Sequence, residues 1–98
     1  MLKKSYSKTG KKCRVTFKLA ADVGAETAVL CGEFNEWDES DKPMKKLKDG
    51  SFSAQLSLDA GNSYRFRYLL DGERWENDWE ADSYLPNEHG TEDSIVKV

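Results

Sequence analysis

Alternating apolar and polar residues predict short β-strands along most of the chain. The alternation is clear over residues 13–19, 52–58 and 64–70, where every second side chain is apolar. This is the period of a strand that buries one face. Residues 27–34 predict a further strand. The turn at residues 60–62 predicts that the two strands it joins form a hairpin.

The C-terminal part adds shorter strands and a long loop. Asp71-Gly72 is a strong signal for a tight turn, so residues 73–75 are predicted to return as the second strand of a hairpin. Residues 76–92 show no regular period, which predicts a long ordered loop, and residues 94–98 predict a final strand. Apolar residues nowhere recur at helical spacing. The chain is therefore predicted to be all-β, an immunoglobulin-like β-sandwich of about seven short antiparallel strands.

Length and charge predict a short arm followed by one domain. A chain of 98 residues has room for one modest core. Residues 1–11 are rich in lysine and lack the alternation, so they are predicted to form a flexible basic arm before a sandwich spanning residues 12–98. The net charge of the chain is −3. An acidic domain repels nucleic acid, and Tyr6 is the only aromatic residue among these lysines, so nucleic-acid binding is not expected.

Composition favours a cytoplasmic protein. No apolar run is long enough for a signal peptide, and no membrane span is expected. Cys13 and Cys31 are predicted to point in opposite directions, which disfavours a disulfide and suits a reducing compartment. The chain has one histidine and no C-x-x-C spacing, so neither a metal site nor a bound cofactor is expected.

Motifs of the common enzyme classes are absent from the sequence. The only histidine, His89, lies in a charged segment, and no G-x-S-x-G motif supplies a nucleophile. The 18 acidic residues make chance carboxylate pairs inevitable, and so small a sandwich offers no evident deep cleft for a catalytic acid. Neither G-x-G-x-x-G nor G-x-x-x-x-G-K-[ST] occurs. The chain is therefore not expected to be an enzyme.

Two tryptophans in polar loops are the strongest candidates for a binding site. Trp37 and Trp75 both lie where a loop leaves or meets a strand, outside the alternating phase of core residues. One such ring alone is as readily explained by partial burial against a turn, whereas two together favour an aromatic platform. The apolar face of a sugar ring stacks on indole, while its hydroxyls need polar partners. Arg67 faces outward on the intervening strand and is a candidate donor.

Two sequence motifs carry a resemblance to a known family. The first is L-C-G-E-F-N-E-W at residues 30–37, and the second is Y-R-F-R-Y-L-L-D-G-E-R-W at residues 64–75, followed by Asn77-Asp78. Together they resemble the family 48 carbohydrate-binding modules. That family includes the glycogen-binding domain of the AMP-activated protein kinase β subunit and the early-set N-terminal domains of isoamylases and glycogen branching enzymes. The resemblance covers about residues 12–98.

The resemblance implies a stacking site for α-1,4-linked glucan. In that family two tryptophans stack on the glucan, and they correspond to Trp37 and Trp75 here. A basic residue between them, usually lysine, corresponds to Arg67. The implied function is non-catalytic binding of glycogen, starch or malto-oligosaccharide.

A late loop completes the site that the resemblance implies. Its contacts in this chain would be His89, Thr91 and Asp93, where the family's glycogen binders have an apolar residue, a threonine and an asparagine. Asp93 keeps an acceptor but loses the amide donors and adds a charge beside a neutral sugar. Trp79 stands where the family often has proline, and it would either extend the aromatic platform or plug the loop onto the sandwich.

The same resemblance implies an alternative function. Many domains of this family accompany a glycoside hydrolase, a branching enzyme or a kinase, and they serve as protein-interaction modules with little sugar binding. The changes at Asp93 and His89 favour this alternative, whereas the two tryptophans favour the glucan. Sugar titration separates the two.

Overall fold

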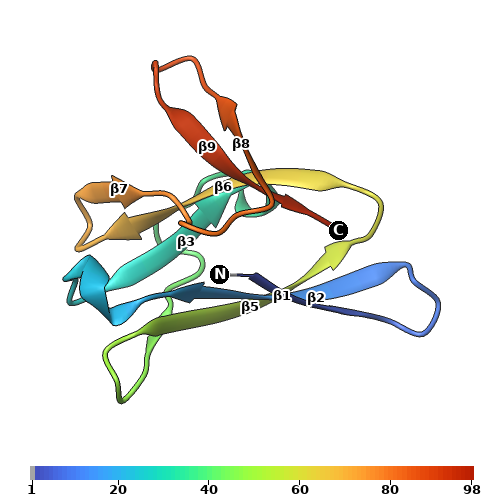
Figure 1. The fold of residues 1–98 in the computed structure, drawn as a ribbon, viewed down its shortest axis with the longest axis horizontal. Helices are drawn as coiled ribbons and strands as arrows, with labels where there is room; N and C mark the ends of the chain where they lie inside the picture. The colour runs from blue at the N-terminus through green and yellow to red at the C-terminus, as the bar shows by residue number, and fades with distance from the viewer. Residues whose placement is uncertain (1) are drawn as a thin grey trace.

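The fold is a sandwich of two antiparallel β-sheets (Figure 1), seen in a computed structural model that describes residues 2–98. The first sheet has the order β1 (Leu2–Tyr6), β2 (Lys12–Leu19), β5 (Phe52–Asp59), β4 (Lys45–Lys46). The second has the order β3 (Ala28–Gly32), β6 (Ser63–Leu70), β9 (Glu92–Lys97), β8 (Ser83–Pro86), and β7 (Arg74–Glu76) also pairs with β6. Two 3-10 turns, η1 (Ala21–Val23) and η2 (Glu33–Asn35), flank β3. The predicted all-β sandwich is confirmed, with nine described strands rather than about seven.

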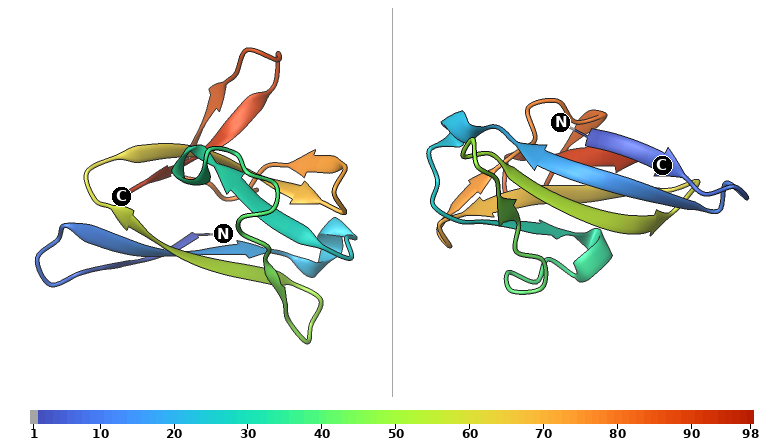
Figure 2. Two further views of the ribbon diagram at one scale, coloured as in Figure 1. Left: turned by 180° about the vertical axis from the view of Figure 1, so that it is seen from behind. Right: turned by 90° about the horizontal axis from the view of Figure 1, so that it is seen from below.

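The core lies between the inner faces of the two sheets. In the view from below in Figure 2, the first sheet lies in front of the second. Phe17 of β2 meets Phe66 of β6 edge to face, with ring centroids 5.0 Å apart, and Phe66 in turn meets Tyr68 at 5.6 Å. All three rings are fully buried. Because side chains alternate along a strand, Arg65 and Arg67 of β6 must project from the opposite, outer face of the second sheet.

The prediction that the strands on either side of residues 60–62 form a hairpin is wrong. Strand β5 pairs with β2 and β4, whereas β6 pairs with β3, β7 and β9, so the turn carries the chain from one sheet to the other. Alternation shows only that each strand buries one face. Two strands that face each other across a core satisfy this pattern as well as two neighbours in one sheet do.

Two segments expected to lack regular structure contain strands. Residues 2–6, assigned to a flexible arm, form β1 and pair with β2, and Lys4 Nζ lies 2.6 Å from Asp82 Oδ2; Met1 lies outside the described residues. Within the predicted loop 76–92, β8 pairs with β9. Both are edge strands whose side chains are mostly exposed, so their sequences carry no hydrophobic alternation. No helix among the described residues is long and apolar enough to cross a membrane.

The predicted tight turn at Asp71-Gly72 is confirmed, since β6 and β7 pair on either side of it. Asp71 has a positive φ of 54°. Its Oδ1 accepts the backbone N–H groups of Glu26 at 2.8 Å and Thr27 at 3.0 Å. The Thr27 and Glu26 donors hold the pKa of Asp71 below its usual range, because they stabilise the ionised carboxylate.

Replacing Asp71 with asparagine should destabilise the domain in a pH-dependent way. The carboxylate has a lower pKa folded than unfolded, where it is about 3.9. The stabilising effect of the ionised carboxylate is therefore fully present above pH 4. It is lost as the pH falls through the pKa of Asp71 in the folded protein. Asp71→Asn should lower the thermal midpoint at pH 7, and circular dichroism should show this difference shrinking toward pH 2. A constant difference at all pH values would contradict the assignment; Asp41→Asn, in an exposed loop, is the control.

Candidate functional site

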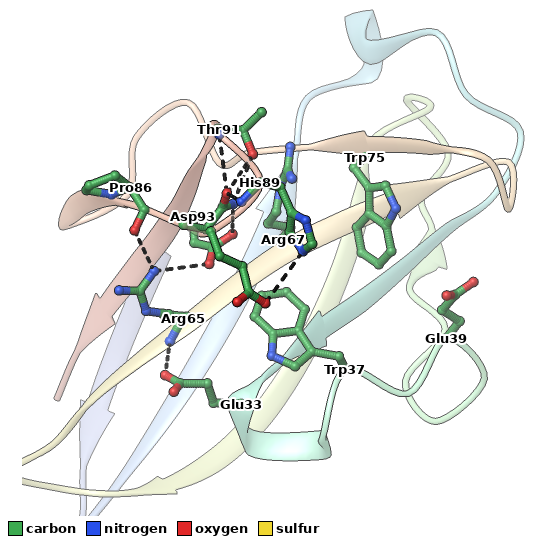
Figure 3. A pocket seen from close by; sticks show the side chains of 12 residues that line it. Glu33, Trp37, Glu39, Arg65, Arg67, Trp75, Pro86, His89, Thr91 and Asp93 are labelled. Carbon is green, nitrogen blue, oxygen red and sulfur yellow. Dashed lines mark hydrogen bonds and ion pairs between the residues drawn. The ribbon is translucent and has the colours of Figure 1, made fainter.

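An open groove of about 810 Å³ lies on the outer face of the second sheet. It is lined by twelve residues: Glu33, Trp37, Glu39, Arg65, Arg67, Trp75, Pro86, Asn87, Glu88, His89, Thr91 and Asp93. They come from η2 and the loop after it, from β6 and β7, and from the ends of β8 and β9 with the connection between them (Figure 3). The structure thus brings together six of the seven predicted site residues, because only Trp79 is outside this lining.

A close approach at Gly32 begins the turn that carries Trp37. A Cβ atom on Gly32 would lie 2.6 Å from the backbone oxygen of Arg65 and 2.7 Å from the Phe34 ring. Its φ of −173° is ordinary extended backbone, so crowding alone requires glycine here. The Phe34 ring packs inward against Phe17 at 5.8 Å. Because Gly32 lies so close to the backbone of β6, the chain can turn at the end of β3 toward the outer face of the sheet.

Asn35 and a pair of left-handed residues complete the turn. The Asn35 side chain accepts the Gly32 N–H at 3.0 Å and donates to the Leu30 carbonyl at 3.0 Å. Glu36 and Trp37 then have φ of 55° and 59°. The Trp37 N–H donates to the Gly32 carbonyl at 2.9 Å. The G-x-F-N-x-W motif therefore encodes a fixed turn that presents the half-buried indole of Trp37 to the groove.

Trp75 reaches the same groove from the neighbouring strand β7. It lies opposite Leu69 of β6, and 38% of its surface is exposed. Trp37, Arg67 and Trp75 line the same groove (Figure 3). Trp79 is 56% exposed and lies outside the groove lining.

Arg67 is a groove cation that has no partner among the residues that the structure describes. It lies opposite Cys31 of β3, and its Nε is buried with no hydrogen-bond partner. Its guanidinium forms no ion pair within residues 2–98, whereas Arg65 pairs with Asp93 at 3.2 Å. A half-buried guanidinium with unused donors is suited to hydrogen-bond a ligand.

The sequence matches the model of a family described as the glycogen recognition site of AMP-activated protein kinase, over residues 13–98. The chain belongs to this family. No curated protein sequence gives a significant match. The family match begins within β2, so β1 precedes the matched part of this member.

The charges of this family member's groove disfavour an anionic ligand. Four carboxylates and two guanidinium groups line it, so its formal charge is negative. Burial, helped by the nearby acids Glu39 and Asp38, raises the pKa of the Cys31 thiol to about 11 and keeps it protonated. His89 is mostly exposed, with Glu88 at 3.9 Å. Among the described residues no cluster suited to a metal ion is found.

Sequence reasoning missed half of the groove lining. The unpredicted members are Glu33, Glu39, Arg65, Pro86, Asn87 and Glu88. The clearest available signal was Asn87, since an asparagine shortly before a glycine is typical of a side chain that organises a turn. Arg65 is two residues before Arg67 on the same strand, so both side chains lie on the groove face.

Proposed function

We propose that this protein binds α-1,4-linked glucan without catalysis, by stacking sugar rings on Trp37 and Trp75. The observation that carries the proposal is the convergence of two indoles and the unpaired Arg67 on one groove. Indole faces bury the apolar C–H face of a glucose ring. Arg67 donates to the sugar hydroxyls, which satisfies a cation that has no partner among residues 2–98.

The electrostatics and the family support the same ligand class. A groove with more carboxylates than guanidinium groups repels phosphates and other anions, whereas glucan is neutral. The family's own description is glycogen recognition. Cys31 stays protonated beneath the groove, so its thiol is not an activated nucleophile. Binding without turnover is the activity that these side chains support.

Isothermal titration calorimetry with maltoheptaose tests the proposal. We expect saturable binding of the α-1,4-linked heptasaccharide and no heat with cellohexaose, whose β-1,4 linkages give a straight chain of the same sugar. No binding of maltoheptaose at millimolar concentration would overturn the proposal. That result would leave protein docking as the function of the fold.

A further inference from the structure

The connection between β8 and β9 is organised by one asparagine side chain. Asn87 Oδ1 accepts the backbone N–H groups of His89 at 2.9 Å and Thr91 at 3.2 Å. Its Nδ2 lies 2.9 Å from the Thr91 hydroxyl oxygen, and that hydroxyl donates back to Asn87 Oδ1 at 3.1 Å. The hydroxyl hydrogen of Thr91 is therefore already engaged within the protein. The loop over residues 87–91 is a turn closed around Asn87.

Asp93 joins this loop to the sheet. Only 6% of Asp93 is exposed, so its carboxylate is largely withdrawn from solvent. Its Oδ1 accepts from Asn87 Nδ2 at 3.0 Å and its Oδ2 from Arg65 Nη1 at 3.2 Å. The negative charge is paired with a guanidinium, and both oxygens have partners before any ligand binds. The Asp93 carboxylate thus accepts hydrogen bonds from Asn87 and Arg65 rather than from a sugar.

Arg65 extends the same set of bonds to the opposite wall of the groove. Its Nη1 also donates to the Pro86 carbonyl at 3.2 Å, and its backbone N–H donates to Glu33 Oε1 at 2.7 Å. Glu33 opens η2, the turn that carries Trp37. Figure 3 shows these bonds running from Glu33 through Arg65 to Asp93. One arginine on the central strand therefore links both walls.

We propose that Arg65, Asp93 and Asn87 are positioning residues of the glucan site, which fix the 87–91 loop relative to Trp37. The inference rests on the proposed function for its ligand. These three residues act through the loop, because their bonds hold His89 and Thr91 at the groove. The presence of aspartate at position 93 is therefore compatible with binding, because Arg65 neutralises it.

A pair of matched asparagine variants tests the role of the loop. Asn87→Ala removes the bonds that close the turn. The control is Asn77→Ala: Asn77 bonds the Glu92 carbonyl and the Ser94 hydroxyl of β9 but lies outside the groove lining. Calorimetry with maltoheptaose should show a dissociation constant at least fivefold weaker for Asn87→Ala and within twofold of wild type for Asn77→Ala. Equal affinities of the two variants would overturn the proposal.

A double-mutant cycle tests whether Arg65 and Asp93 act as a pair on maltoheptaose binding. Arg65→Gln leaves the buried Asp93 unpaired, and Asp93→Asn leaves Arg65 unpaired, so each should weaken maltoheptaose binding severalfold. The double variant restores a neutral amide pair and should recover most of the affinity. Additive losses in the double variant would contradict a positioning network.

A ligand-free measurement keeps this inference distinct from the proposed function. In ¹H–¹⁵N spectra without sugar, Asn87→Ala should shift the amide signals of His89 and Thr91 and the indole signal of Trp37, while Asn77→Ala should leave them in place. Unmoved signals in Asn87→Ala would overturn the network. Failure of wild-type protein to bind maltoheptaose would instead overturn the proposed function.

Discussion

Replacing Trp37 with alanine should weaken maltoheptaose binding by about thirtyfold or more, and Trp75→Ala should have a similar effect. Each change removes an indole face, and losing on the order of 100 Å² of apolar contact costs about 2 kcal/mol, which corresponds to about thirtyfold in the dissociation constant. Trp37 reaches the groove from the turn after η2 and Trp75 reaches it from β7, so each can take a separate sugar ring. Calorimetry measures both losses directly.

Trp79→Ala is the matched control for these two variants. Trp79 is the third and last tryptophan of the chain, and it is exposed outside the groove lining. Its removal should leave the dissociation constant within twofold of wild type. Strong binding by Trp37→Ala, or a loss confined to Trp79→Ala, would contradict the assignment of the stacking pair.

Replacing Gly32 with alanine should lower the free energy of unfolding by about 2–3 kcal/mol, the upper part of the usual range of about 1–3 kcal/mol for forcing an atom into a packed site. The added Cβ would lie 2.6 Å from the Arg65 carbonyl oxygen, which belongs to the central strand of the second sheet. Urea unfolding followed by circular dichroism measures the loss. Sugar binding should weaken as well, because the Gly32 carbonyl accepts the N–H of Trp37.

Gly10→Ala provides the contrast for this prediction. Gly10 has a φ of 72° and no atom within 4 Å of its added Cβ, so the substitution introduces backbone strain without crowding. Its cost should be about 1 kcal/mol, and maltoheptaose binding should not change. A Gly32→Ala protein as stable as Gly10→Ala would show that the close approach to β6 does not constrain the turn.

The sandwich and the stacking pair could be predicted because their signals are local. Alternation over eight residues shows directly which side chains of β2, β5 and β6 are buried, and it places Arg67 on an outer face. The two tryptophans stand out because they break that alternation and lie in compact motifs. The position of Trp37 follows from Gly32 and Asn35, which lie within five residues of it.

The remaining features depend on contacts between distant segments. Whether β5 and β6 share a sheet is decided by their partners β2 and β9, about which alternation says nothing. The role of Asp93 depends on Arg65, which is 28 residues away in the chain. Viewed alone, Asp93 is a charge added beside a sugar. Only the fold shows that the charge is already paired.

The indole N–H signals of the three tryptophans give the most direct test of the central claim, that the glucan stacks on Trp37 and Trp75. A ¹H–¹⁵N spectrum resolves these signals individually, and single tryptophan-to-phenylalanine variants assign them. Adding maltoheptaose should shift the Trp37 and Trp75 signals along one saturation curve and leave the Trp79 signal in place. Saturable shifts at Trp79 alone, or no indole shift at millimolar maltoheptaose, would contradict the claim.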